Sequence, residues 1–346
     1  MEHQQANSWL AHQPRGGLQG MFLRLAAVGE TLFVLLGMIV IARLVFRATG
    51  LADADSFLFG DDVVPDFRAA AVAESQWHAI RYGLVFIAVI IIGWIRQRRG
   101  RAAYGVTTGG HSISWLIAFG VGVFAIIHVP SLILRLADHY LDIGPGTLFW
   151  ALMKETEWNT DFWLYMAVSS FAVVPLVEEF VARGYMLGRF RESFSPGGGL
   201  VVVALIFSSA HTQYHQADLY SIGMLLALVW GSIVMGYAVY RTGSLLPPII
   251  AHILVNVPTS IAADYVIIVL IALTMFLFRG AFGVNARRLW AILRSVNDWP
   301  SLAMIGVVIV AFGMTLQATP WAPYAWLGGF FALFVASLFV KSKWSE

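Results

Sequence analysis

Long apolar runs separated by short polar segments dominate the hydrophobic pattern of this chain. A helix that crosses a membrane needs about 20 mostly apolar residues. Ten stretches fit that description: 23–46, 79–95, 113–134, 162–187, 198–216, 219–240, 245–260, 261–278, 301–318 and 324–340. Pro247, Pro248 and Pro258 interrupt the pattern over 245–278, which fits either one long kinked helix or two shorter ones. The pattern predicts an all-α fold, a polytopic transmembrane helical bundle with about eight to ten spans.

Composition supports the membrane interpretation. Apolar residues make up 59% of the 346 and charged residues only 12%, against roughly 45–50% and ~25% in soluble domains. A soluble chain of this length could not bury so much apolar surface, so the lipid bilayer is the expected partner. A net charge of +2 without a long basic block argues against nucleic acid. The absence of cysteine excludes disulfides, thiol nucleophiles and thiolate metal sites.

The basic residues between the spans predict an orientation. The strongest cluster follows the second span and contains Arg96, Arg98, Arg99 and Arg101, which places that loop in the cytoplasm because cytoplasmic loops are enriched in Lys and Arg. The acidic segment 48–77 and the segment 135–161 then fall outside. Residues 1–22 become a cytoplasmic tail, the first span serves as an uncleaved insertion signal, and both termini are cytoplasmic. We expect a multi-pass protein of a bacterial inner (plasma) membrane.

Ionisable residues within these apolar runs are concentrated in three stretches, 177–184, 207–215 and 247–256. Charged groups are costly inside a bilayer, so each one is a candidate for function. Glu30 is an isolated case in the first span. It could be a functional carboxylate, but a residue near the interface or bonded to a neighbour is the more common situation.

Helical spacing assigns different partners to the two adjacent carboxylates of the first stretch. Glu179 and Arg183 are four residues apart, so they lie on one helix face and can form an ion pair. Glu178 is rotated by about 100° from Glu179 and cannot share that pair. The spacing therefore predicts that Glu178 is the carboxylate left to face a cavity.

The other two stretches each supply a polar helix face. Phe207 and His211 are four residues apart, as are His252 and Asn256. Counted from the expected cytoplasmic ends, Glu178 and His211 lie on the order of 14–20 Å deep, near the middle of a ~30 Å apolar core. His252 lies nearer the surface by this count, and a modest helix tilt brings it to the others. Three helices can thus enclose one wet pocket.

Such a pocket favours the activation of water. A buried carboxylate can act as a general base, a histidine can position the water, and an asparagine amide can donate to a developing oxyanion. The same groups could instead bind a divalent metal, because His nitrogens and carboxylate oxygens are standard zinc ligands. The structural alternative is that the polar residues only tie helices together, at about 0.6 kcal/mol per contact.

Taken in order, the motifs Glu-Glu-x-x-x-Arg, Phe-x-x-x-His and His-x-x-x-Asn resemble the CPBP intramembrane protease family, whose best-known branch is the type II CAAX prenyl endopeptidases. The resemblance covers about 160–260 and implies a glutamate-dependent protease or metalloprotease. It implies that Glu178 and His211 activate water, and that His252 and Asn256 stabilise the tetrahedral intermediate. Glu179, Arg183 and Phe207 would be supporting residues. It leaves open a zinc ion held by Glu178, His211 and His252, and no other cofactor is implied.

The resemblance divides the chain into four parts: the tail at 1–22, an N-terminal transmembrane region at 23–159, a catalytic CPBP-like transmembrane core at 160–280, and a basic loop with a C-terminal transmembrane extension at 281–346. The implied partner is a peptide or membrane-protein substrate, with or without a lipid group. Two other functions remain open. A proton-coupled membrane transporter would spread its polar residues along a path in two related halves. A non-catalytic immunity or scaffold protein could use the same fold.

Overall fold

The computed structural model describes residues 17–49, 67–96, 101–144, 166–211, 214–257, 259–318 and 321–338, and every regular element in these ranges is a helix. In chain order they are α2 (Gly17–Thr49), α4 (Phe67–Ile95), the 3-10 turn η1 (Arg101–Tyr104), α5 (Ile113–Leu141), the π-helical η2 (Met166–Val173), α8 (Val174–Glu179), the π-helical η3 (Phe180–Met186), α9 (Leu187–Phe190), α10 (Pro196–Ser209), α11 (Leu219–Thr242), α12 (Leu246–Val255), α13 (Ile261–Leu277), α14 (Arg279–Arg294), α15 (Trp299–Ala318) and α16 (Ala322–Leu338). The all-α prediction is confirmed.

Each of the ten predicted spans contains a helix, but the helices differ in length. Four are long and apolar enough to cross a membrane: Gly17–Val45, Ser75–Ile95, Ile113–Leu141 and Leu219–Thr242. The bent pair of α13 and α14 would make a fifth, and the apolar helices α10, α12 and α16 are shorter than 18 residues. The chain is therefore an integral multi-pass membrane protein, and the count of ten spans stays a prediction.

Two predicted loops are partly helical. Helix α4 begins at Phe67, so residues 67–77 of the expected outside loop are helical, and α5 continues to Leu141 instead of ending at 134. The first residue beyond the expected end of this span is Arg135. Its charge is neutralised by the buried Asp264, whose Oδ2 lies 2.7 Å from Nη2 of Arg135. Residues 50–66 and 145–161 of the two loops lie outside the described ranges, as does most of the predicted tail, 1–16.

The region 245–278 forms two separate helices, α12 and α13. Pro247 and Pro248 sit in the first turn of α12, where the missing N–H groups cost no helical hydrogen bond. The basic segment after α13, predicted as a loop, is instead the helix α14, bent by 85° from α13. It is amphipathic: Leu289 and Ile292 are buried, while its arginines are exposed. The prediction missed this helix because it judged the segment by its charge and not by its periodicity.

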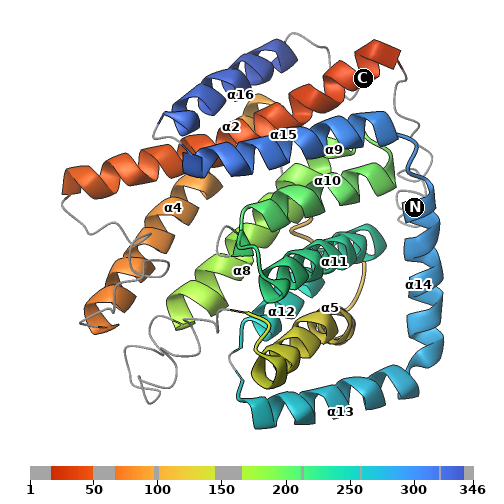
Figure 1. Cartoon of the computed structure of the whole chain (residues 1–346). Coiled ribbons are helices and arrows are strands. Elements are labelled where there is room, and N and C mark those ends of the chain that lie inside the picture. The colour runs from red at the N-terminus through yellow and green to blue at the C-terminus, as the bar shows by residue number, and fades with distance from the viewer. Residues whose placement is uncertain are drawn as a thin grey trace.

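The helices group around the stretch from η2 to α9 (Figure 1). Helices α2, α15 and α16 pack together on one side, and α5, α11 and α12 pack together on the other. Gly120 of α5 lies so close to the backbone of Pro247 in α12 that a side chain would collide with it. Helix α12, which carries His252, is thereby held firmly against α5. Helix α8, which carries Glu178, lies between α4 and α12.

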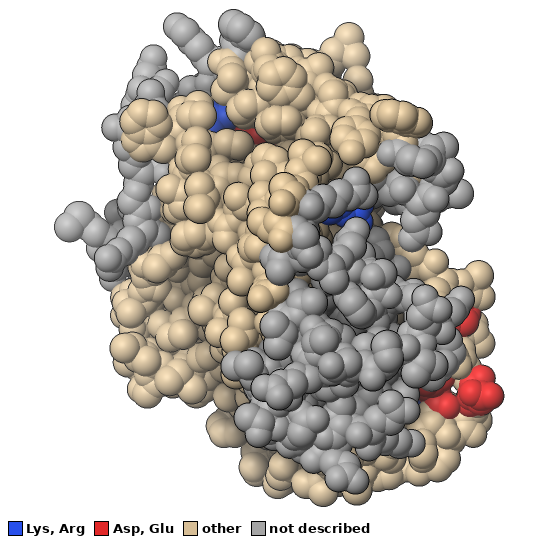
Figure 2. Space-filling view, turned by 90° about the vertical axis from the view of Figure 1, so that its left-hand side faces the viewer, with Lys and Arg blue, Asp and Glu red and all other residues tan. Residues whose placement is uncertain are grey.

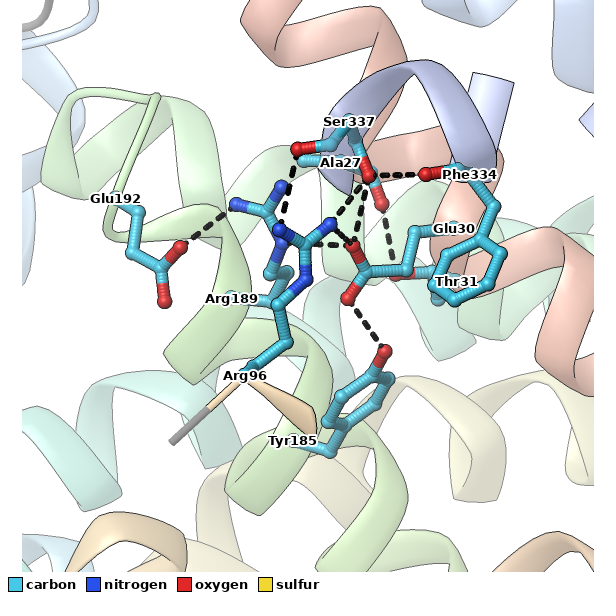
Figure 3. A network of polar contacts seen from close by, with 9 residues as sticks. All are labelled: Ala27, Glu30, Thr31, Arg96, Tyr185, Arg189, Glu192, Phe334 and Ser337. Carbon is cyan, nitrogen blue, oxygen red and sulfur yellow. Dashed lines mark hydrogen bonds and ion pairs between the residues drawn. The ribbon is translucent and has the colours of Figure 1, made fainter. Parts of the chain in front are cut away.

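The few charges of the chain are largely engaged within the bundle. Few described charged side chains appear on the face in Figure 2, and most of that described surface is uncharged. Glu30 is fully buried and forms ion pairs with Arg96 and with Arg189, whose Nε lies 3.2 Å from Oε2 (Figure 3). The hydroxyl of Tyr185 donates to Oε1 of Glu30 at 2.8 Å, and Ser337 of α16 donates to Oε2. Glu30 is thus bonded to its neighbours, as the more common interpretation held.

Polar contacts connect the C-terminal helices α15 and α16 to the rest of the bundle. Ser337 connects α16 to the Glu30 network, which also reaches α9 through Arg189. At the start of α15, Asp298 pairs with Arg24 of α2 at 2.6 Å and accepts from the backbone N–H of Ser195 at 2.9 Å. The C-terminal helices therefore pack as a scaffold against α2 and α10.

Candidate active site

The carboxylates of the first motif lie where π-helical turns flank a short α-helix. Residues 166–190 form one helical stretch in which η2 and η3 enclose the six residues of α8. π-helical turns are uncommon and often occur at functional sites. The side chain of Glu179 is fully buried, whereas that of Glu178 is 19% exposed. The two neighbours thus face different surroundings, as helical geometry requires.

Glu179 belongs to a buried ion pair. Its Oε1 lies 2.9 Å from Nη1 of Arg183, and both side chains are completely buried. Arg183 also donates through Nη2 to Oγ of Ser232 at 3.0 Å, and its guanidinium lies 4.6 Å from the centre of the Phe207 ring. The pair expected from the four-residue spacing is present. Phe207 contributes a cation–π contact to it.

His252 is oriented by the same carboxylate. Its Nδ1 lies 2.8 Å from Oε1 of Glu179. The same oxygen accepts a hydrogen bond from Arg183, so Oε1 is an acceptor in both contacts. Nδ1 is therefore the donor. The other ring nitrogen, Nε2, points to Glu178, whose Oε2 lies 3.9 Å away. This separation is too long for a hydrogen bond, but one water oxygen at about 2.8 Å from each atom can contact both.

His211 occupies a different position from the one predicted. Helix α10 ends at Ser209, so His211 follows the helix instead of lying on its face. Its Nδ1 lies 2.8 Å from the backbone oxygen of Phe207, one of the last carbonyls of the helix, which lack an intrahelical partner. A carbonyl only accepts, so Nδ1 donates and Nε2 of the neutral ring is left as an acceptor. The Ser209 hydroxyl also donates to the backbone oxygen of Ile206, and such local bonds compete with a continuing helix.

The two oxygens of Glu178 have different surroundings. Oε1 accepts a hydrogen bond from the hydroxyl of Tyr82 in α4. Oε2 is buried and has no hydrogen-bond partner among the described residues. Glu178 also lies close enough to both His211 and His252 for their charges to interact. The structure thus brings Glu178 together with both histidines.

Asn256 completes the third motif. It follows the last residue of α12, and its backbone N–H donates to the carbonyl of His252 at 3.1 Å. The helical backbone therefore continues from His252 to Asn256, and the four-residue spacing places both on one face. The second and third motifs thus both end at a helix C-terminus.

Sequence reasoning did not identify Tyr82 or Ser232. One signal was available for Tyr82: His78 and Tyr82 are four residues apart in a predicted apolar region, so they share a helix face. Nδ1 of His78 lies 2.6 Å from Oγ of Ser169 in η2, so this face of α4 does pack against the helical stretch 166–190 that carries Glu178. Ser232 had no comparable signal, because a single serine on a span is ordinary.

The arrangement of the residues does not match the zinc site that the resemblance left open. No group of three or more His, Asp or Glu side chains with metal-binding geometry occurs in the part of the chain that the structure describes. Nε2 of both histidines and Oε2 of Glu178 remain as possible ligand atoms, since metal-binding histidines usually have the other ring nitrogen hydrogen-bonded, but the three side chains are not gathered in a metal-binding arrangement. We therefore derive no catalytic step through a metal.

Comparison with known proteins places the motifs in a family. Residues 158–258 match the family model described as type II CAAX prenyl endopeptidase Rce1-like. No curated protein and no solved structure matches the chain. The matched segment covers less than a third of the 346 residues, but it contains all three motifs. The part of the chain that forms the candidate site thus matches the type II CAAX prenyl endopeptidase family, as the ordered motifs predicted.

Proposed function

We propose that the protein is an intramembrane endopeptidase in which Glu178 activates the attacking water. One observation carries the proposal: the unpartnered Oε2 of Glu178 faces Nε2 of His252 at 3.9 Å. This arrangement lies within the segment that matches a family of endopeptidases. A water molecule between the two atoms could donate its proton to Oε2 of Glu178, and its contact with Nε2 of His252 would hold it in position.

In the first step, the water oxygen forms a bond with the carbonyl carbon of the scissile peptide. One water proton moves to Glu178, and the carbonyl π electrons move to the oxygen, which becomes an oxyanion. Nε2 of His211 accepts a hydrogen bond from the water and orients it, because Nδ1 is committed to the Phe207 carbonyl. Apart from the attacking water, all the groups in this step come from the protein and the substrate.

The oxyanion needs donors. The carboxylate of Glu179 accepts Nδ1–H of His252, and in the proposed mechanism this ring carries a proton on both nitrogens throughout the cycle, so that Nε2–H donates to the oxyanion. The amide of Asn256 is the second donor. When the intermediate collapses, the C=O bond reforms and the C–N bond breaks. The proton held by Glu178 passes to the leaving nitrogen, which restores the carboxylate.

The substrate is a peptide at or within the membrane. The name of the matched family specifies prenylated C-termini, and we propose a lipid-modified peptide as the first class to test. An unmodified peptide or membrane protein is the alternative within the same mechanism. The two substrate classes differ in whether a lipid group is attached next to the cleaved bond. A cleavage assay with matched peptides separates them.

The test uses the full-length protein in liposomes, with farnesylated and unmodified versions of one fluorogenic CAAX peptide. Glu178→Gln keeps the side-chain shape but removes the base, so cleavage should fall about 10²–10⁴-fold. Asp142→Asn is the matched control: it also removes one carboxylate, and Asn tolerates the left-handed backbone of this exposed position at the end of α5. If neither peptide is cleaved, the membrane peptides of cells that carry the wild-type protein are compared with those of cells that carry Glu178→Gln, in order to find the substrate. Full activity in Glu178→Gln would end the mechanism.

A further inference from the structure

Helix α14 lies across the end of the bundle. It bends by 85° away from α13 and runs along one side of the molecule in Figure 1. Ile292 of α14 packs so closely on Gly197, at the start of α10, that its carbonyl leaves no room there for a side chain. The same end of the bundle contains the first residues of α5 and the last residues of α11. Helix α14 thus lies where several apolar helices begin or end.

The composition of α14 suits a membrane surface. Between Arg279 and Arg294 it carries four arginines and no acidic residue. Leu289 and Ile292 are buried against the bundle, while Trp290 is 55% exposed. A helix with basic residues on one side and Trp or Leu on the other characteristically lies in the plane of the lipid headgroups.

A cavity of about 380 Å³ opens between α14 and the ends of α5 and α11. Its walls include two arginines, Arg241 and Arg288, and two aromatic residues, Trp115 and Phe119. The aromatic rings are stacked with their centres 5.1 Å apart. Gly280 also lines the cavity and has open space where a side chain would project. The volume is at the lower end of the ~300–1,000 Å³ typical of ligand sites.

The two arginines of the cavity have their charges unopposed. No carboxylate of the described residues forms an ion pair with Arg241 or Arg288. Arg24, Arg96 and Arg189, by contrast, each have an acidic partner. Asn285, which also lines the cavity, is uncharged: its Oδ1 accepts from Tyr237 at 2.7 Å, and its Nδ2 donates one hydrogen to the Ala281 carbonyl at 2.9 Å. The charge of the cavity is therefore positive.

We infer that this cavity binds the headgroup of an anionic phospholipid, with the phosphate between Arg241 and Arg288. Guanidinium groups match phosphate oxygens in geometry and charge. The stacked Trp115 and Phe119 provide an apolar wall for the start of an acyl chain. A free phosphate ion would leave that wall without a partner, and a zwitterionic lipid would bring the cationic group of its headgroup close to the two arginines together with its phosphate. This inference does not depend on the proposed proteolysis.

The test measures lipid binding by the full-length protein in nanodiscs of phosphatidylcholine with increasing fractions of phosphatidylglycerol. One phosphatidylglycerol carrying brominated acyl chains serves as the probe, because bromine quenches nearby tryptophan fluorescence. We expect saturable quenching that is reduced in Trp115→Phe. The double variant Arg241→Gln/Arg288→Gln should bind about a hundredfold more weakly, since each hydrogen bond from a guanidinium to the phosphate contributes about tenfold or more.

The matched control is Arg279→Gln/Arg287→Gln, which removes the same charge from the same end of the molecule but does not alter the residues lining the cavity. It should retain saturable binding. Equal losses in both double variants would reduce the site to general attraction between basic protein and anionic lipid, and would overturn the proposal. Displacement of the lipid by millimolar inorganic phosphate would identify a soluble-anion site instead. Thermal unfolding in pure phosphatidylcholine checks that each variant is folded, and Arg241→Lys/Arg288→Lys provides a charge-conserving variant with intermediate binding.

Discussion

Nδ1 of His252 lies 2.8 Å from Oε1 of Glu179, and the same carboxylate oxygen lies 2.9 Å from Nη1 of Arg183. One buried carboxylate therefore neutralises a cation of its own helix and orients a histidine of another. Through that hydrogen bond the second glutamate of the motif sets which nitrogen of His252 faces Glu178. Glu179 acts in the proposed mechanism as a positioning residue.

Glu179→Gln should damage both stability and activity. The substitution leaves Arg183 without its counter-charge in a fully buried position, a situation that costs about 3–5 kcal/mol. Arg183→Gln should have a similar effect, and the double variant should recover part of the loss. A double-mutant cycle on unfolding in detergent measures this coupling. Additive losses would show that the two side chains do not act as a pair.

Tyr82→Phe tests the contact that sequence reasoning missed. The substitution removes the hydroxyl that donates to Oε1 of Glu178 and leaves the ring in place. We expect kcat to fall about tenfold with little change in KM, since losing a hydrogen bond to a charged group costs about 1.5–3 kcal/mol. Tyr265→Phe, which removes an exposed hydroxyl 2.5 Å from that of Tyr140, is the control. Unchanged kinetics in Tyr82→Phe would mean that this contact does not orient the base.

Glu30→Gln should destabilise the fold. Glu30 is fully buried and opposes both Arg96 and Arg189, so its neutralisation leaves two cations with one fewer partner and should cost about 3–5 kcal/mol. Glu192→Gln breaks another ion pair of Arg189, but its side chain is 21% exposed and the loss should stay below about 1 kcal/mol. Unfolding in detergent compares the two. Equal, small losses would contradict a structural role for the Glu30 network.

Removal of metal ions by a chelator tests whether cleavage needs the zinc ion that the resemblance left open. Because the described residues form no cluster of three metal-binding side chains, we expect cleavage to survive dialysis against a strong zinc chelator. The measurement is peptide cleavage in liposomes together with the metal content of the purified protein. Loss of activity that added zinc restores would show that Glu178, His211 and His252 rearrange to bind a metal.

The predicted topology can be tested with reporter fusions. Fusions after Gly60, Gly105, Trp150, Glu192 and Trp290 should read outside, inside, outside, inside and inside, because basic residues favour the cytoplasmic side. The position of α14 agrees with this assignment, since Trp290 and the start of α10 lie at the same end of the bundle. An outside signal at Gly105 would reverse the orientation and place α14 on the opposite leaflet.

The sequence by itself determined what depends on spacing along one helix. Low charge and long apolar runs predicted a helical membrane protein, and the four-residue interval between Glu179 and Arg183 predicted their ion pair. The order of the three motifs predicted the family that residues 158–258 match. Each of these features is local or compositional, so it can be inferred without knowing which helices are neighbours.

Only the tertiary structure decided the contacts between helices. The bond from His252 to Glu179 spans 73 residues, and the bond from Tyr82 to Glu178 spans 96. Helix ends also depended on the fold: α5 continues past Arg135 because Asp264 of another helix neutralises that charge. Many pairings of apolar helices satisfy the same hydrophobic pattern. The packing of complementary surfaces selects one of them, and with it the partners of each buried polar group.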